Sequence, residues 1–366
     1  MWQKGRTFIP TTYKYISRMN ILVTGASGFI GSYIVEEGLR RGHQVWAGVR
    51  KSSSRAYLQD ERIHMACLDL AHEDVLVQQL QQYKEQMGGR GWDYVVHAAG
   101  ATKCLHPEDF YRTNLQGTVH LVQALRRAGM MPRRLVYLSS LSVFGAIREQ
   151  PVREATPDNP WVYAPIVDTD TPQPNTEYGR SKWQAEQWLA EQQDVPYTVL
   201  RPTGVYGPRE KDYFLMAQSI ARHTDFSVGF RPQEITFVYV MDVVQAVYQC
   251  MDSGQAVGKA YFLSDGQVYN SRRFSDLLQQ NLGNPWVLHI KAPLWFLRIV
   301  CLLSGTLSRL TDRMNALNMD KYHILSQRNW QCDITPARRD FNYEPQWPLE
   351  RGVAAAVRWY KARGWL

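Results

Sequence analysis

Residues 21–31 read ILVTGASGFIG, so a short apolar and β-branched run leads directly into a glycine-rich turn. The run predicts a buried strand over 21–24, and the apolar spacing after the turn predicts a helix over 30–41 that ends at Gly42. Glycines at 25, 28 and 31 permit a tight turn and a close approach to a pyrophosphate, which the free N–H groups of the helix start attract. This strand–turn–helix pattern predicts a dinucleotide-binding βαβ unit.

Length and composition fit a globular protein. The chain has 366 residues, of which 45% are hydrophobic and 21% charged, so disordered and collagen-like classes are excluded. No apolar run is long enough to predict a transmembrane helix. Five scattered cysteines without a C-x-x-C pair argue against a disulfide framework or a zinc site, so we expect no metal and a cytoplasmic, reducing compartment.

The net charge of +8 does not indicate a nucleic-acid partner, because residues 1–18 hold four basic residues and no acid. We expect a natural start at Met19, with 1–18 as an N-terminal extension. Residues 19–204 then form mainly the dinucleotide-binding domain, and residues 205–366 form mainly a smaller substrate-binding part interleaved with it.

Beyond the glycine turn, apolar runs alternate with helical patterns, which predicts an α/β protein with a doubly wound parallel sheet of the Rossmann type. The expected strands are 44–49, 94–98, 135–139, 198–200, 236–240 and 259–263, and the expected helices are 73–86, 115–128, 181–192, 214–222 and 242–251. The last 90 residues are expected to be largely helical. Six prolines in 146–177 forbid a long regular element and predict a loop that covers the substrate.

The residues after the second strand indicate which dinucleotide is bound. An NAD-binding chain usually carries an acid there for the ribose 2′-hydroxyl, but 44–49 has none and Arg50 and Lys51 follow. A guanidinium favours a 2′-phosphate, so NADP(H) is the predicted cofactor and NAD the alternative. The competing interpretation is that both cations are solvated loop charges.

Several later motifs keep a consistent order along the chain. They are Asp69-Leu70, His97-Ala98-Ala99-Gly100, Asn114 before a helix, Ser139-Ser140, Tyr178-Gly179-Arg180-Ser181-Lys182 and LRPTGVYGP at 200–208. Together with the glycine turn, they resemble the extended short-chain dehydrogenase/reductase superfamily, which includes the NAD-dependent epimerase/dehydratase family, over residues 19–366.

The resemblance implies a catalytic set. Tyr178 would exchange a proton with the substrate oxygen, and Ser140 would hydrogen-bond that oxygen, with Ser142 as an alternative. Tyr178 and Lys182 are four positions apart and share a helix face, so the ammonium could lower the pKa of the phenol. The resemblance also has Lys182 hold the nicotinamide ribose, while Asn114 supports a water relay or the local backbone.

The cofactor contacts form a longer set. Asp69 and Leu70 are expected at the adenine, Pro202 near the carboxamide, and His97 as a buried polar residue beside the cofactor. The full set is Gly25, Ser27, Gly28, Phe29, Ile30, Gly31, Arg50, Lys51, Asp69, Leu70, Ala98, Ala99, Gly100, Tyr178, Lys182, Pro202, Thr203 and Val205.

Departures from the family pattern indicate which branch of the family the chain resembles. Residues 140–142 read SLS where sugar-nucleotide 4,6-dehydratases carry Thr-Asp-Glu, so water elimination lacks its acid–base pair. The arginine that clamps a diphosphate in epimerases is replaced near Thr236 by an uncharged residue, although Arg231 could substitute. The 200–208 motif and the aromatic C-terminus at 359–365 look more like the 3β-hydroxysteroid dehydrogenase and dihydroflavonol reductase branch.

Residues 292–307 are strongly apolar but too short and interrupted to span a bilayer. They could lie at a membrane interface, line a lipid-accepting cleft, or pack on the core as a cap helix. The leading hypothesis is an NADP(H)-preferring oxidoreductase that interconverts a ketone and a secondary alcohol on a hydrophobic small molecule, such as a 3-oxo sphingoid or sterol-like compound. The alternatives are a nucleotide-sugar epimerase that retains NAD and a non-catalytic dinucleotide sensor. The resemblance also suggests a homodimer.

Overall fold

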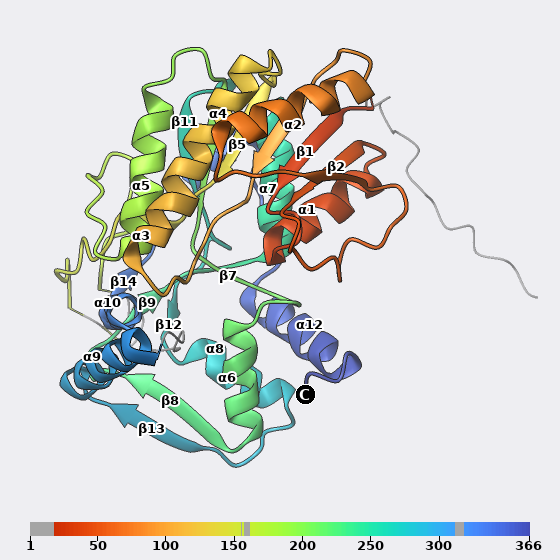
Figure 1. Cartoon of the computed structure of the whole chain (residues 1–366). Helices are drawn as coiled ribbons and strands as arrows, with labels where there is room; N and C mark the ends of the chain where they lie inside the picture. The colour runs from red at the N-terminus through yellow and green to blue at the C-terminus, as the bar shows by residue number, and fades with distance from the viewer. Residues whose placement is uncertain (1–17, 155, 157–161, 312–317) are drawn as a thin grey trace, which may run out of the picture.

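A seven-stranded parallel sheet organises the chain between residues 20 and 263. The computed structural model describes residues 18–154, 156, 162–311 and 318–366, so nearly all of the expected N-terminal extension lies outside the described residues. The strand order is β11-β6-β5-β4-β1-β2-β3, which confirms the predicted doubly wound α/β fold (Figure 1). The strands are β1 (Asn20–Thr24), β2 (Gln44–Val49), β3 (His64–Cys67), β4 (Tyr94–His97), β5 (Arg134–Leu138), β6 (Tyr197–Pro202) and β11 (Lys259–Leu263).

Helices cover both faces of this sheet, because successive strand residues point to opposite sides. Ile21 and Val23 of β1 pack into one apolar cluster, and Leu22 packs into the other. The first face carries α1 (Phe29–Arg40), α7 (Val240–Asp252) and α11 (Thr335–Phe341); the second carries α2 (Glu73–Gln86), α4 (Gly117–Arg127) and α5 (Glu177–Ala190).

Element bounds follow the sequence pattern closely where local signals are strong. The bounds of β2, α2 and β11 agree with the prediction, and Gly42 takes the positive φ expected after a helix. The helix predicted over 181–192 begins earlier, at Glu177, because the Thr176 side chain caps it by accepting the N–H of Gly179. The helix predicted over 115–128 is preceded by α3 (Pro107–Phe110) and a π-helix (Tyr111–Gln116).

The later segments form a second layer below the sheet in Figure 1. Its strands are β7 (Gly204–Tyr206) with β10 (Phe237–Tyr239), β12 (Tyr269–Asn270) with β9 (Glu234–Ile235) and β14 (Asn329–Trp330), and the parallel pair β8 (Thr224–Val228) with β13 (Leu288–Ala292). Its helices are α6 (Asp212–Ala221), α8 (Arg273–Asn281), α9 (Leu294–Thr311), α10 (Met319–Ser326) and α12 (Leu349–Ala362). Short 3₁₀ turns occur at Leu141–Val143 and Gly254–Ala256.

An aromatic cluster holds the second layer together. Tyr206 is fully buried, and the ring centroids of Phe274 and Tyr239 lie 5.4 and 5.5 Å from its own. Gly352 of α12 sits so close to Tyr206 that an added Cβ would overlap the phenol oxygen. The C-terminal helix therefore packs directly on the strand that follows the Rossmann sheet.

The proline-rich segment 146–177 forms no long regular element in its described part, as predicted. An isolated bridge joins Ile166 to Cys332, and the backbone N–H groups of Val162 and Tyr163 donate to the Glu234 carboxylate of β9. The segment is thus fastened to the second layer. Within the described ranges, no helix combines the length and apolar character that crossing a bilayer requires.

Candidate active site

The glycine turn after β1 has the shape of a phosphate cradle. Gly25 has a φ of +67°, and a Cβ there would lie 2.6 Å from the backbone nitrogen of Ala99. Gly28 has no side chain that could cap α1, so the first-turn N–H groups of the helix are directed at the turn. The turn 25–31 and the segment 98–100 after β4 lie together, because β1 and β4 are neighbours in the sheet. These residues fit a dinucleotide pyrophosphate.

The predicted adenine and ribose contacts follow the next two strands. Arg50 and Lys51 come directly after β2 and are both exposed. Asp69 and Leu70 follow β3, and the Asp69 carboxylate accepts from the Ala71 N–H at 3.0 Å. The strands β1, β2 and β3 are parallel neighbours, so these segments meet at one edge of the sheet.

Ser140 and Tyr178 meet beside this cradle. Ser140 lies just beyond the end of β5, its hydroxyl donates to the Ser142 hydroxyl at 3.1 Å, and its side chain lies close enough to Tyr178 to lower the pKa of the phenol. Burial raises the pKa of Tyr178 above its ordinary value, and the Ser140 hydrogen bond partly offsets that rise. Ser142, the sequence alternative, is engaged with Ser140, whose side-chain oxygen accepts the Ser142 N–H at 3.1 Å.

Lys182 lies one helical turn beyond Tyr178 and is buried. Its ammonium donates to the Leu138 carbonyl at 2.8 Å and lies 4.7 Å from the Tyr137 ring centroid. Burial lowers the pKa of Lys182 to about 8, while the carboxylate of Glu186 raises it. In this structure burial dominates the pKa of Tyr178, so the lowering by Lys182 stays a prediction.

The sequence analysis missed a buried ion pair behind the site. Glu186 continues the face of α5 that carries Tyr178 and Lys182. Its carboxylate accepts from the Ser139 hydroxyl and from the Arg201 guanidinium, with the Arg201 Nε 3.0 Å away. The partners come from distant strands, so only the i, i+4, i+8 spacing on α5 could have indicated Glu186.

Asn114 holds backbone and helix together. It is fully buried in the π-helix. Its amide nitrogen donates to the Ala101 carbonyl at 3.0 Å and to the Ser181 hydroxyl at 2.9 Å. Its amide oxygen accepts the Ala101 N–H at 2.8 Å. These contacts favour the backbone role over the water relay. A Cβ at Gly100 would lie 3.0 Å from the Lys182 nitrogen and 3.1 Å from the Asn114 oxygen, so the chain passes close to both.

His97 is a buried polar residue, as expected. Its ring nitrogens pair with the hydroxyls of Thr24 at 2.7 Å and Thr118 at 3.1 Å. Burial, with Lys182 adding to it, lowers the pKa of His97 to about 3. The imidazole is therefore neutral near neutral pH and holds β4 to β1 and α4.

Pro202, Thr203 and Val205 lie where β6 passes into β7, opposite Ser140 along the sheet edge. The Thr203 hydroxyl donates to the Thr236 carbonyl at 2.8 Å, so that side chain is already engaged within the protein. Thr236 is itself buried and donates to the Trp330 carbonyl at 2.6 Å. Thr236, near which epimerases carry their arginine, is thus buried and hydrogen-bonded within the protein. Arg231, the possible substitute for that arginine, is exposed.

A second missed residue comes from the far end of the chain. The carboxylate of Asp320, on α10, accepts the backbone N–H groups of Glu177 at 3.1 Å and Tyr178 at 3.4 Å. Burial raises the pKa of Asp320. No local pattern links two segments so distant in sequence, so only the folded structure reveals this contact.

The Rossmann sheet carries the glycine turn 25–31, and helix α5 beside it carries Tyr178 and Lys182. Together these features define an NAD(P)-dependent enzyme of the extended short-chain dehydrogenase/reductase type. Residues 21–270 match the profile of the NAD dependent epimerase/dehydratase family, so the chain belongs to that family. Among the described residues, no group of three or more His, Cys, Asp or Glu side chains is placed to hold a metal ion.

Proteins similar to this chain have names that refer to different activities. The chain is 27% identical over 356 residues to sterol demethylase protein B of Methylococcus capsulatus, covering 94% of this chain and 99% of that protein. It is 25% identical over 361 residues to a 3 beta-hydroxysteroid dehydrogenase/Delta 5-->4-isomerase of Mycobacterium tuberculosis, covering 93% and 90%. The solved UDP-glucose 4-epimerase of Thermotoga maritima has the same fold, with a TM-score of 0.71, 22% identity and coverage of 94% and 99%.

Proposed function

We propose that this protein is an NADP(H)-preferring oxidoreductase that interconverts a ketone and a secondary alcohol on a hydrophobic small molecule. The observation that carries the proposal is the placement of Ser140 beside the Tyr178 phenol, with the buried Lys182 ammonium one turn along α5. Two relatives have names that refer to sterols or steroids, which supports the sterol-like substrate; the 3-oxo sphingoid stays an alternative prediction.

Each residue has a chemical task in this proposal. When bound, the reduced nicotinamide supplies hydride to the carbonyl carbon. Ser140 orients the carbonyl oxygen, and Tyr178 donates its phenolic proton to that oxygen, so the ketone gains one hydride and one proton. The raised pKa of Tyr178 keeps the phenol protonated at neutral pH, which suits it to the reductive direction. In this proposal the positive charge of Lys182, one turn along α5, would favour the phenolate left behind.

The cofactor preference rests on the residues after β2. Over Gln44–Val49 there is no acid to bind a ribose 2′-hydroxyl, and Arg50 and Lys51 are exposed at the strand end. A guanidinium binds phosphate oxygens in a fork geometry, which favours a 2′-phosphate.

A nucleotide-sugar epimerase is the second candidate, because the fold is shared with a solved enzyme of that class. The buried Thr236 stands against it, because an uncharged residue replaces the epimerase arginine near this position. A cytoplasmic location, a homodimer and a membrane contact through residues 292–307 stay predictions.

The first experiment follows the oxidation of NADPH and, separately, NADH with a panel of hydrophobic ketones. We expect faster NADPH consumption, and a loss of about 100-fold to 10,000-fold in kcat for Tyr178→Phe with unchanged NADPH affinity. Tyr197→Phe, at the start of β6 and so at the opposite end of that strand from Pro202, is the matched control and should retain full activity.

Two outcomes would overturn the proposal. Full turnover by Tyr178→Phe would exclude the phenol as proton donor. Tightly bound NAD released on denaturation, with no net cofactor consumption with any ketone, would favour the epimerase.

A further inference from the structure

The strands β8 and β13 and the helix α9 lie at the end of the molecule farthest from β1 (Figure 1), and many of their large apolar side chains are exposed. We call this surface the apolar end face. Phe230, Trp295 and Leu303 are 67%, 65% and 67% exposed, and Phe226 and Phe296 are 63% and 49% exposed. Large apolar side chains exposed close together mark an interaction site.

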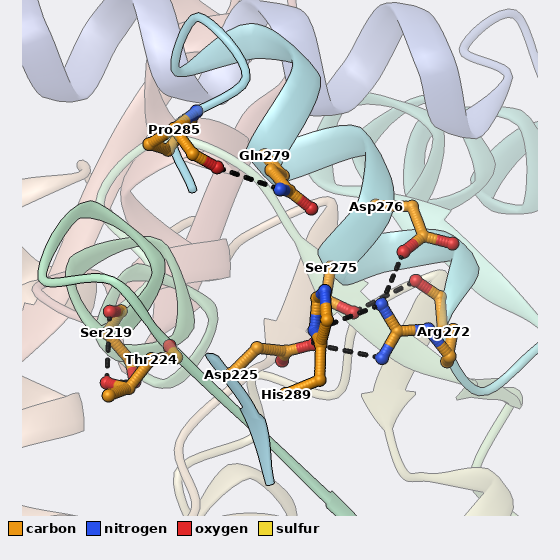
Figure 2. A network of polar contacts seen from close by, with 9 residues as sticks. All are labelled: Ser219, Thr224, Asp225, Arg272, Ser275, Asp276, Gln279, Pro285 and His289. Carbon is orange, nitrogen blue, oxygen red and sulfur yellow. Dashed lines mark hydrogen bonds and ion pairs between the residues drawn. The ribbon is translucent and has the colours of Figure 1, made fainter. Parts of the chain in front are cut away.

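The strand pair presents its apolar side outward. Phe226 is in register with Ile290, and Asp225 with His289, so the pairs point to opposite faces of the β8–β13 ribbon. Figure 2 shows that the buried Asp225 accepts from Arg272 at 3.2 Å and pairs with His289 at 3.1 Å. This network ties the polar face of the ribbon to the start of α8, which turns Phe226 and Ile290 toward solvent.

Helix α9 also turns many of its apolar side chains toward solvent. Leu297 and Cys301, one turn apart, are buried against the protein, whereas Trp295, Phe296 and Leu303 are exposed. Among the α9 residues whose side chains are described, the one charged residue is Arg298, which is exposed. This exposure disfavours the interpretation of the segment as a cap helix packed on the core.

The exposed charged side chains described on this surface are cations. Arg231, Lys291 and Arg298 are exposed, and the sequence from 286 to 309 contains no aspartate or glutamate. The Lys291 ammonium lies 5.2 Å from the Phe230 ring centroid, so a cation borders the exposed aromatics. Aromatic and aliphatic side chains with interspersed cations and no acid complement the headgroup region of an anionic membrane.

We propose that the apolar end face binds peripherally to the surface of an anionic lipid bilayer. The exposed side chains of α9 and the ribbon enter the headgroup–acyl boundary, while Arg231, Lys291 and Arg298 contact lipid phosphates. Binding of this type scales with the apolar area buried and with the number of cations, so it is weakened by salt.

A pocket of about 280 Å³ opens in the same face and is lined by Phe230, Trp295, Leu325 and Ser326, among others. Leu325 and Ser326 end α10, whose first turn carries Asp320 against the Tyr178 helix. On a docked protein the pocket would therefore face the lipid. It would lie next to α10, the helix that contacts α5, which carries Tyr178. This supply of lipid substrate rests on the proposed function; the docking itself does not.

The test is sedimentation of the purified full chain with phosphatidylcholine vesicles, with and without phosphatidylglycerol. We expect binding that needs the anionic lipid and falls as salt rises. Trp295→Glu and Leu303→Glu should each lower the partition coefficient more than about tenfold, and Arg298→Gln about fivefold. Val75→Glu, an equally simple change at an exposed valine of α2, should bind like the unmodified chain.

Equal binding by the Trp295→Glu, Leu303→Glu and unmodified chains would overturn the proposal. Concentration-dependent dimerisation that these variants abolish, without vesicle binding, would instead assign the face to a second copy of the chain. NADPH oxidation with a water-soluble ketone, measured without vesicles, separates the two proposals. Activity without vesicle binding would refute docking alone, and vesicle binding without activity would refute the oxidoreductase alone.

Discussion

Burial controls the protonation of the side chains around the candidate site. Lys182 and His97 are both enclosed, and burial lowers the pKa of each, to about 8 and about 3 respectively. Lys182 keeps its charge near neutral pH because its depressed pKa still lies above 7, whereas His97 stays neutral. The imidazole is thus a structural group whose two ring nitrogens bridge the hydroxyls of Thr24 and Thr118.

The folded chain should therefore lose stability in mild acid through His97. Its folded pKa of about 3 lies below the ordinary 6.5, so below pH 6.5 the unfolded chain binds a proton that the folded chain does not. The free energy of unfolding should fall by about 2 kcal/mol between pH 6.5 and about pH 5 from this group. Urea unfolding of the unmodified chain and His97→Gln at both pH values measures it.

The His97→Gln variant should be less stable than the unmodified chain at neutral pH, but its free energy of unfolding should fall less on acidification. His64→Gln, which changes an exposed imidazole on β3, is the control and should keep the full loss. An identical acid dependence in His97→Gln and the unmodified chain would exclude His97 as the cause.

At the scale of the element, the N-terminus of α5 is fixed from two sides. Thr176 caps it locally, and Asp320 of α10 accepts the N–H groups of Glu177 and Tyr178. A carboxylate at a helix N-terminus also interacts favourably with the helix dipole. Asp320 therefore acts as a positioning residue for Tyr178, through the helix and without touching the phenol.

We expect Asp320→Ala to lower kcat by up to about tenfold, because loss of a helix cap costs about 1 kcal/mol and frays the turn that carries Tyr178. NADPH affinity should stay unchanged, since the cradle after β1 is not involved. Asp320→Asn should restore most of the activity, because an asparagine oxygen can also accept these N–H groups. Unchanged kcat in Asp320→Ala, or failure of asparagine to rescue it, would contradict this role.

The elements that the sequence predicts well are those with local signals. The glycine turn, β2, α2 and the Tyr178–Lys182 spacing are each set by residues close in sequence. The ribbon β8–β13 was missed, because its apolar residues face outward and its strands pair across a long separation. Asp320 was missed for the same reason, since a cap supplied by another element leaves no local pattern.

At the scale of the whole molecule, one contact joins the C-terminal helix to the rest of the fold. Gly352 of α12 lies against the fully buried Tyr206 of β7, in the aromatic cluster of the second layer. The close approach leaves no space for a methyl group, and the surrounding rings are themselves buried. Interiors of this density respond to added volume by shifting backbone or side chains.

Gly352→Ala should therefore lower the free energy of unfolding by about 1–3 kcal/mol, even though alanine favours a helix. Thermal unfolding followed by circular dichroism measures the change. Gly254→Ala is the matched control, because an added Cβ there meets nothing within 4 Å, and it should unfold like the unmodified chain. Equal stability of the two variants would show that α12 is free to move away from Tyr206.

The parallel pairing of β8 with β13 also fixes an order of events during folding. Asp225 and His289, which face each other across the ribbon, are 64 positions apart in sequence. Closing so long a loop costs entropy that few contacts repay until the intervening α7, β11 and α8 have folded onto the sheet and the aromatic cluster. We therefore expect a newly synthesised chain to complete its cofactor-binding sheet first and to gain affinity for lipid only afterwards.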